Sequence, residues 1–122
     1  MRRRDEDGLQ RAAIELCTKK YRRDLMAYHT PNGGYRNRIE AARLQGLGVL
    51  AGVPDITLAI RGGRLGYIEL KTPKGRPSTA QIIFRAAAEG LGIPWVLCRS
   101  ITEVDEAVGS ILEASRNGAD TG

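Results

Sequence analysis

The sequence predicts an α/β protein in which a mixed β-sheet is flanked by helices. Residues 55–60 and 65–71 are strand-like apolar runs joined by Arg61-Gly62-Gly63-Arg64, which is typical of a tight antiparallel hairpin. A helical pattern at 78–91 and a short apolar run at 93–99 follow the second strand. A strand, a helix and another strand in this order favour a parallel crossover, so the sheet is expected to contain both kinds of pairing.

Four segments are interpreted as helices. Residues 5–21 repeat apolar side chains at helical spacing, and residues 37–46 are a short helix that carries Ile39, Ala42 and Leu44. Ser78 and Ser100 stand where N-caps are expected for the third and fourth helices, and Glu103 is placed for a capping box with Ser100. The apolar positions expected to face the core are Leu9, Ala12, Ala13, Leu16 and Cys17, then Ile83, Phe84, Ala87, Ala88 and Leu91, and finally Val104, Val108, Ile111 and Leu112.

The remaining segments complete the predicted order α-β-(α)-β-β-α-β-α. Residues 24–30 form a short strand, and Pro31-Asn-Gly-Gly34 is a turn by its composition. The chain of 122 residues suits a single domain with one modest core, so we expect residues 1–122 to form one domain. Residues 117–122 are expected to be a flexible tail.

The charge balance favours a polyanionic partner. Hydrophobic residues make up 42% and charged residues 27%, as in soluble globular proteins, while the formal net charge is +5 and the isoelectric point is near 9.6. A basic surplus is an argument about binding and not about fold. A solvated basic surface is the alternative, because the lysines and arginines are spread along the chain.

Cysteine usage and hydropathy indicate a cytoplasmic protein. Cys17 and Cys98 fall in separate elements and form neither a zinc-binding spacing nor a disulfide framework, so free thiols are expected. Met1 is followed by arginines and acids, and no apolar run approaches the roughly 18–20 residues that span a bilayer. We therefore expect a location in the cytoplasm of a bacterium or of a phage-infected cell, with no membrane partner.

Asp55, Glu69 and Lys71 are the residues most indicative of chemistry. Asp55 follows the turn Gly52-Val-Pro54 and begins a strand, while Glu69 and Lys71 lie two apart on the next strand. Side chains alternate along a strand, so Glu69 and Lys71 share a face and lie roughly 6.5–7 Å apart along it. If the two strands pair, Asp55 can lie beside them. Glu-x-Lys alone is also common among solvated strand residues, so the turn and the hairpin strengthen the interpretation.

This residue set suits metal-dependent hydrolysis of a phosphodiester. A divalent cation can activate water, position the phosphate and neutralise developing charge. Mg²⁺ prefers oxygen ligands and keeps several waters, so the Asp55 and Glu69 carboxylates and the Leu70 carbonyl are sufficient candidate ligands, and Mn²⁺ is the other candidate metal. Lys71 would orient the attacking water or stabilise the transition state. The glycines do not match a nucleotide-binding motif, and no nucleotide cofactor is expected.

The segment Gly52-Val-Pro-Asp55, followed by Tyr67-Ile-Glu-Leu-Lys-Thr-Pro-Lys-Gly-Arg-Pro-Ser-Thr-Ala-Gln81, resembles the virus-type replication-repair nuclease (VRR-NUC) domain of the PD-(D/E)xK nuclease superfamily. The resemblance extends to Pro31-Asn-Gly-Gly34 and to Glu6-x-x-x-Gln10, and so covers nearly the whole chain. It implies a restriction-endonuclease-like αβββαβ core, a divalent metal and cleavage of DNA, with branched DNA as the substrate. The arrangement is also similar to archaeal-type Holliday-junction resolvases, and stand-alone members of this size look like phage or prophage proteins.

The resemblance implies a set of catalytic residues. Asp55, Glu69 and Lys71 match the catalytic triplet of the superfamily. Glu6 matches the acid of the first helix that commonly helps to bind the metal, and Glu15 is its competitor on the same helix. Glu6 is preferred because its spacing to the apolar stripe places it at the core-side end of that helix. Its alternative role is that of a favourable acid in a first helical turn.

Further residues of the motif have both a structural and a functional interpretation. Gln81 matches the helix glutamine of the family, but Ser78-Thr-Ala-Gln81 is itself a capping box. His29, the only histidine, is interpreted as a polar residue at a strand end, with a general base as the alternative. The residues expected to contact DNA are Asn32, Arg36, Arg38, Lys74 and Arg76.

These observations together predict a Mg²⁺- or Mn²⁺-dependent DNA endonuclease acting on branched DNA such as Holliday junctions. A homodimer is expected by analogy with resolvases, because a small domain offers little surface for a four-way junction. Flap or exonuclease action is a competing hypothesis. A non-catalytic DNA-binding module with the nuclease fold is another, and so is a small phage protein that binds a protein partner.

Overall fold

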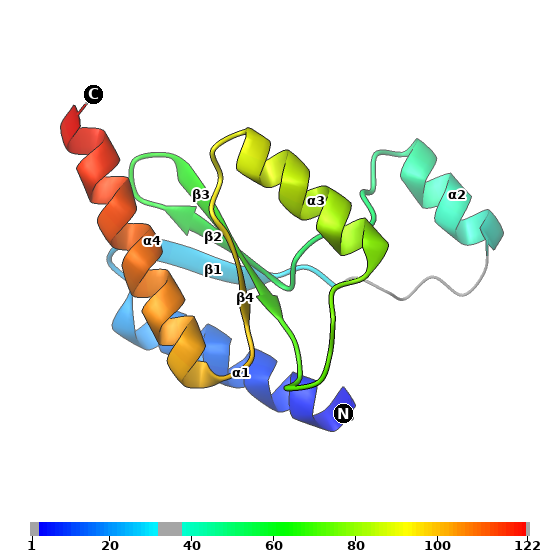
Figure 1. The fold of residues 1–122 in the computed structure, drawn as a ribbon, viewed down its shortest axis with the longest axis horizontal. Helices are drawn as coiled ribbons and strands as arrows, with labels where there is room; N and C mark the ends of the chain where they lie inside the picture. Colours follow the sequence, from blue (N-terminus) through cyan, green and yellow to red (C-terminus); the bar gives the residue numbers. More distant parts are fainter. Residues whose placement is uncertain (1–2, 32–37, 122) are drawn as a thin grey trace.

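The computed structural model describes residues 3–31 and 38–121 of the chain. The elements follow the predicted order, with one small helix between the first two strands (Figure 1). They are α1 (Arg3–Lys20), β1 (Leu25–His29), α2 (Arg38–Gly46), β2 (Ile56–Ile60), β3 (Arg64–Leu70), α3 (Thr79–Gly90), β4 (Trp95–Cys98) and α4 (Ile101–Thr121). The predicted turn at residues 31–34 lies largely outside the described residues. Helix α4 continues through most of the segment expected to be a flexible tail.

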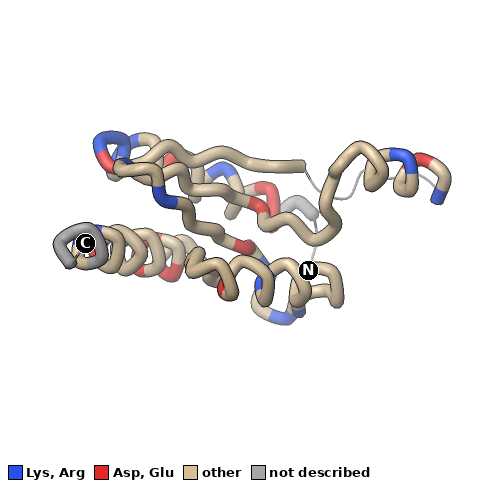
Figure 2. Tube along the Cα trace, turned by 90° about the horizontal axis from the view of Figure 1, so that it is seen from above, with Lys and Arg blue, Asp and Glu red and all other residues tan. Residues whose placement is uncertain are grey.

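The four strands form one mixed sheet in the order β1-β2-β3-β4. The pairs β1–β2 and β2–β3 are antiparallel, and β3–β4 is parallel, as expected for a hairpin followed by a helical crossover. Helices α1 and α4 lie side by side on one face of the sheet, and α3 lies on the other (Figures 1 and 2). The predicted α/β class with a mixed, helix-flanked sheet is confirmed.

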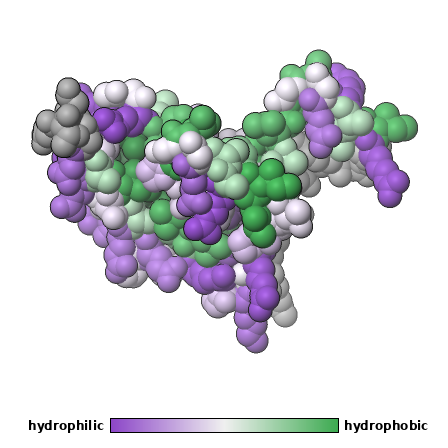
Figure 3. Space-filling view, turned by 45° about the horizontal axis from the view of Figure 1, so that its top comes forward, coloured by the Kyte–Doolittle hydropathy of each residue, from purple (hydrophilic) through white to green (hydrophobic). Residues whose placement is uncertain are grey.

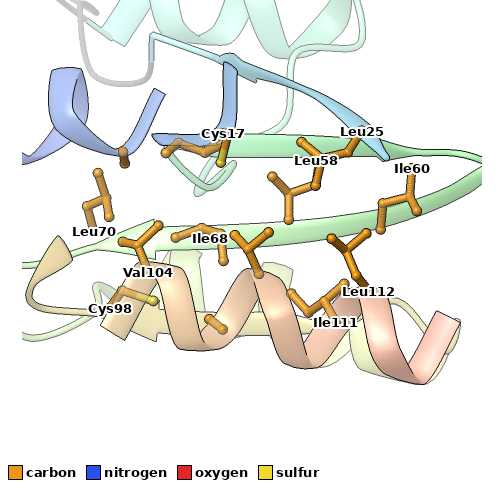
Figure 4. Packing of buried hydrophobic residues seen from close by; sticks show 14 residues of the cluster. Cys17, Leu25, Leu58, Ile60, Ile68, Leu70, Cys98, Val104, Ile111 and Leu112 are labelled. Carbon is orange, nitrogen blue, oxygen red and sulfur yellow. The ribbon is translucent and has the colours of Figure 1, made fainter. Parts of the chain in front are cut away.

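The hydrophobic core lies between the sheet and the pair α1–α4. Because side chains alternate along each strand, the even-numbered residues of β2 and β3 all project toward these helices. The core consists of Ala13, Cys17, Leu25, Ile56, Leu58, Ile60, Ile68, Leu70, Cys98, Val104, Ala107, Val108, Ile111 and Leu112, most of which Figure 4 labels. The burial predicted for the apolar stripe of α4 is confirmed.

Both cysteines are free and buried in this core, as predicted. Burial raises the pKa of Cys17 to about 11 and that of Cys98 to about 12, with smaller contributions from Asp105 and Glu103. The two thiols therefore stay protonated near neutral pH and act as small apolar side chains. No helix in the described part of the chain is long and apolar enough to cross a bilayer.

The burial predicted for α3 is wrong for three of the five residues of its apolar stripe. Ala88 is buried and Phe84 is partly buried against the sheet, but Ile83 and Leu91 are 65% and 77% exposed, and Ala87 is exposed too. The physical reason is the asymmetry of the fold. One face of the sheet receives two helices, whereas the other receives only α3, which lies over β3 and β4.

Both predicted N-cap residues are confirmed, but only α3 has the full predicted capping box. At α3, the Ser78 hydroxyl accepts from the Gln81 backbone N–H at 3.2 Å, and the Gln81 side chain accepts from the Ser78 N–H at 2.8 Å. At α4, the Ser100 hydroxyl accepts from the Glu103 N–H at 3.2 Å. The Glu103 carboxylate, however, accepts from the Arg99 N–H at 2.7 Å, one residue before the expected partner.

The turn before Asp55 depends on a glycine. Gly52 has φ of +77°, a conformation that residues with a side chain rarely adopt. A Cβ at Gly52 would also collide with the backbone carbonyl of Ala80 in the first turn of α3. The Gly52-Val-Pro54 turn therefore packs backbone against backbone on α3, and this contact determines where Asp55 emerges beside the sheet.

Replacing Gly52 with alanine should destabilise the protein by about 2–5 kcal/mol, because a strained backbone and a steric clash act at the same place. Gly62→Ala is the matched control. Gly62 also has a positive φ, +90°, but open space around it, so only about 1–2 kcal/mol is expected there. Urea unfolding followed by circular dichroism measures both. Equal losses would contradict the packing argument.

Candidate active site

A cleft of about 200 Å³ lies at the end of the sheet where β1 and β3 finish and β2 begins. Its walls come from the start of α1, the three strand ends and the first turn of α3. The lining residues are Glu6, Asp7, Gln10, His29, Asp55, Glu69, Leu70, Lys71 and Gln81. All five residues predicted as catalytic, Glu6, Asp55, Glu69, Lys71 and Gln81, therefore lie around one cleft.

The register of the hairpin brings the two acids together. Ile56 pairs with Ile68 across the antiparallel strands, so Asp55 and Glu69, one step outward on each strand, come opposite one another. The Asp55 carboxylate is oriented by the Leu70 backbone N–H, which donates to its Oδ2 at 2.8 Å. The Asp55 carbonyl accepts from the Thr30 N–H at 3.2 Å and from His29 Nδ1 at 2.7 Å, which ties the turn to the end of β1.

Glu69 is a buried carboxylate with an unpaired oxygen. The residue is only 1% exposed, and its Oε2 has no hydrogen-bond partner within the described part of the chain. A buried acceptor without a partner costs about 1–3 kcal/mol, so such a group in a cleft indicates that something outside the chain completes it.

The metal-free surroundings of Glu69 oppose its ionisation. Burial, and then a hydrogen bond and the negative charge from Asp55, raise the pKa of Glu69 from 4.5 to about 9. The Glu6 carboxylate adds to this effect, and the nearby Lys71 ammonium group reduces it. A bound cation would reverse the balance, because positive charge beside the two acids favours their ionised forms.

The residues present fit a divalent cation that keeps part of its water shell. Two neighbouring carboxylates, one of them with a buried free oxygen, and the backbone of Leu70 line the same cleft. The described side chains include no cluster of three Asp, Glu, His or Cys residues close enough to hold a metal by themselves. A cation here would therefore rely on Asp55, Glu69, a main-chain carbonyl and water, which Mg²⁺ and Mn²⁺ accept.

The structure separates the two acids considered on the first helix. Glu6 lines the cleft and its charge acts on Glu69. Glu15 is exposed and forms an i,i+4 ion pair with Lys19 at 2.7 Å, and that hydrogen bond lowers the pKa of Glu15. The geometry thus favours Glu6 over Glu15 as the first-helix acid of the candidate site.

Gln81 forms the predicted capping box and also lines the cleft. The capping box uses only its side-chain oxygen, which accepts from the Ser78 N–H. The residue still lines the cleft, so its amide nitrogen remains the group that it can offer there. A role in the site therefore requires no exchange of the capping partner.

Two cleft residues, Asp7 and Gln10, have no place among the predicted site residues. Gln10 is the more informative, because its Nε2 is buried and has no partner among the described residues. The sequence signal was present in Glu6-x-x-x-Gln10, since residues four apart lie on one face of a helix. His29, interpreted as a strand-end residue, also lies in the cleft through its bond to the Asp55 carbonyl.

Of the five residues predicted to contact DNA, three are exposed in the structure and two lie outside the described residues. Lys74 and Arg76 are exposed on the loop after β3, which Arg99 holds by donating to the Thr72 and Gly75 carbonyls at 2.6 and 2.7 Å. Arg38 is exposed on α2. Asn32 and Arg36 lie outside the described residues. Figure 2 shows Lys and Arg on several elements of the fold.

Two solved structures are similar to the chain over most of its length. One, described as a VRR_NUC domain protein, has a TM-score of 0.68 at 21% identity, and the match covers 88% of each chain. Another, described as a VRR_NUC domain, has a TM-score of 0.58 at 17% identity and covers 85% of this chain and 94% of that structure. The chain has the fold of a VRR-NUC domain. No family model and no curated protein matches the sequence.

The VRR-NUC fold agrees with the predicted αβββαβ order. In this chain α1, β1, β2, β3, α3 and β4 supply that order, and α2 is inserted between β1 and β2. The likeness to solved structures concerns the fold. The chemistry proposed below is supported instead by the groups that this chain places in the cleft.

The metal-free protein should lose stability as the pH rises, because folding favours the neutral form of Glu69. The pKa of Glu69 in the folded protein, about 9, lies above its ordinary value of 4.5. The stability that this pKa difference contributes is therefore fully present below pH 4.5 and is lost as the pH rises toward 9. Glu69→Gln should remove this decline. Melting temperatures in chelator at pH 5, 7 and 9 test it, with the exposed Glu106→Gln as control. Parallel curves for wild type and Glu69→Gln would contradict the assignment.

Proposed function

We propose that this protein is a divalent-metal-dependent deoxyribonuclease. The observation that carries the proposal is the buried Glu69 carboxylate, which has an unpaired oxygen and lies opposite Asp55 in a cleft that also contains Lys71. The two acids by themselves offer a phosphate no positive charge, and a cation between them would turn the same cleft into a phosphate-binding site. The VRR-NUC fold supports a nuclease-type function.

Each residue has a specific role in the proposed reaction. A bound Mg²⁺ or Mn²⁺ would supply Lewis-acid activation and charge neutralisation. Asp55 and Glu69 hold it, with the Leu70 carbonyl as a further oxygen. Lys71 orients the attacking water or stabilises the charge that develops on the phosphate as the water oxygen bonds to phosphorus and the P–O bond to a sugar oxygen breaks. The released sugar oxygen takes up a proton, and the product ends in a phosphate monoester. Glu6 acts from α1 through water, and the Gln81 amide faces the substrate.

Gln10 contributes a hydrogen-bond donor to the same site. Its buried amide nitrogen lacks an acceptor within the described chain, and the cleft that it lines is where a phosphate oxygen or an attacking water would lie. Either group would satisfy this donor, and the gain would be realised only when substrate is bound.

The proposed substrate is DNA, and branched DNA such as a Holliday junction is the form we propose it prefers. The net charge of +5 favours a polyanion, and the exposed Lys74 and Arg76 lie on the loop that leaves the site. Base-specific recognition is not part of the proposal, so shape and backbone contacts would select the substrate. A two-fold homodimer would provide paired clefts for paired cuts. The free buried thiols are compatible with the cytoplasm of a bacterium or a phage-infected cell.

Lys71→Ala should reduce cleavage at least about 100-fold while leaving folding intact, because Lys71 is partly exposed and serves the reaction more than the core. The measurement is cleavage of a labelled four-way junction and a matching linear duplex at low salt with Mg²⁺ or Mn²⁺. Lys19→Ala is the control and should retain activity, because Lys19 is exposed and does not line the cleft.

The outcomes separate the proposals. Metal-dependent cutting of the junction alone supports a structure-selective endonuclease, and equal cutting of both DNAs retains the nuclease but removes the junction preference. Release of products from one end or at a flap would replace endonuclease action with exonuclease or flap action. Binding without cutting by the wild type would favour a non-catalytic module, and the absence of both would favour a protein-binding role.

Gln10→Ala should lower cleavage by about 10–100-fold and leave the melting temperature unchanged or slightly higher, because it removes a buried donor without a partner. Steady-state kinetics and thermal unfolding on the same preparations test both parts. Gln45→Ala on α2, an exposed glutamine, is the matched control. A lower melting temperature together with normal cleavage would assign Gln10 to packing instead.

A further inference from the structure

The short helix α2 has no core of its own. No residue of α2, all of which lie in the described range, is buried, and Figures 1 and 2 both show it projecting from one end of the molecule. We call residues 38–50 the arm. Within it, Ile39 is 83% exposed, Leu47 is 70% exposed and Leu50 is 63% exposed. Isolated helices shorter than about 12–15 residues are marginal in water, and this nine-residue helix buries none of its side chains within the described part of the chain.

A second apolar surface lies on the sheet face that carries α3. Met26, Ala59 and Leu65 form one row across β1, β2 and β3, pointing away from the core. Met26 is 63% exposed and Leu65 39%, because α3 lies over β3 and β4 and leaves this side of the sheet uncovered. Tyr28 in the neighbouring row is 46% exposed.

The exposed stripe of α3 borders this uncovered part of the sheet. Phe84 packs edge-on against Tyr67 of β3, and Arg85 lies over Trp95 of β4, so the flank of α3 beyond Phe84 is turned toward β2 and β1. That flank carries Ile83, Ala87 and Leu91. Leu91 also shares a surface hollow with Leu65, which joins the helix flank to the strand row.

These residues define a trough, made of Met26, Tyr28, Leu65, Ile83, Ala87 and Leu91. The trough has α3 as its side and the sheet face as its floor. A second helix that packed there would contact a sheet and a neighbouring helix, as helices do in layered α/β folds. The stripe from Ile83 to Leu91 is about 12 Å long, and the nine residues of α2 span about 13 Å. Figure 3 shows hydrophobic residues gathered over α3 and around α2 on the same side of the molecule.

We propose that the arm of one copy of this chain packs into the trough of a second copy, and that the exchange is reciprocal. In a dimer with two-fold symmetry, both arms and both troughs would be covered at once. If only one arm bound, one arm and one trough would stay exposed. The C-terminal end of the arm leads into Gly52, which contacts the Ala80 carbonyl in the first turn of α3. The arm is therefore attached near the N-terminus of α3, whereas Leu91 lies at the C-terminus of that helix.

The apolar area is what a stable dimer requires. The arm and the trough contain all but two, Ile82 and Ile101, of the large hydrophobic side chains found exposed in the described chain. At roughly 100 Å² for a fully exposed aliphatic side chain, they present on the order of 500 Å² of apolar surface per copy. A standard interface of about 800 Å² per partner, a little over half of it apolar, needs a similar amount.

The test is the mass of the full chain by sedimentation equilibrium over a wide concentration range. The wild type should be a dimer of twice 13.3 kDa. Leu47→Asp in the arm and Leu91→Asp in the trough should each raise the dimer dissociation constant at least about 100-fold, because a two-fold interface carries each change twice. Circular dichroism should show both variants folded, since both positions are exposed. Ile82→Asp, exposed on the other flank of α3, is the matched control and should remain dimeric.

Mixing the two variants identifies the exchange itself. A pair of Leu47→Asp and Leu91→Asp chains retains one intact arm in one intact trough, so the mixture should dimerise more tightly than either variant alone. No recovery on mixing would overturn the reciprocal exchange, as would a dimer that only Ile82→Asp disrupts. A monomeric wild type whose melting temperature falls with Leu47→Asp would place the arm on its own chain. Sedimentation equilibrium measures the mass of the protein without any cleavage assay. A failure of the proposed exchange can therefore be told apart from a failure of the proposed nuclease activity.

Discussion

The antiparallel register between β2 and β3 is the constraint on which the rest of the structure depends. Pairing Ile56 with Ile68 directs the apolar residues of both strands to one face and buries them against α1 and α4. The same register brings Asp55 opposite Glu69 at the end of the hairpin. A slip of one residue would turn the core outward and separate the acids, so the hydrophobic effect that stabilises the sheet also specifies the candidate site.

The candidate site shows a conflict between folding and function. Folding alone does not favour a carboxylate that is 1% exposed and has an unpaired oxygen. The fold tolerates Glu69 because its neighbours provide most of the required stability and because the acid can remain protonated in the absence of a cation. The unpaired donor of Gln10 in the same cleft is a second local cost. Groups of this kind concentrate where a ligand completes them, and here they lie together.

The two faces of the sheet differ in how completely they are covered. Two helices enclose one face, and the single helix α3 leaves Met26, Tyr28 and Leu65 exposed on the other. The arm is left without a core at the same time. A small domain with limited interior volume often completes its packing by association, and in this chain the exposed helix α2 and the exposed stripe of α3 are of similar length.

The sequence by itself determined the class of the fold, the order of its elements and the central acids of the site. Strand alternation at Glu69 and Lys71, the hairpin glycines and the capping box from Ser78 to Gln81 are local signals, and local signals can be read from neighbouring residues. Only the tertiary structure decided which apolar residues are buried. The stripe Ile83, Ala87 and Leu91 has the pattern of a core face, but its exposure depends on how many elements cover that side of the sheet. Likewise, the unpaired groups of Glu69 and Gln10 became visible only in three dimensions, because a missing partner is a property of the surroundings and not of the chain.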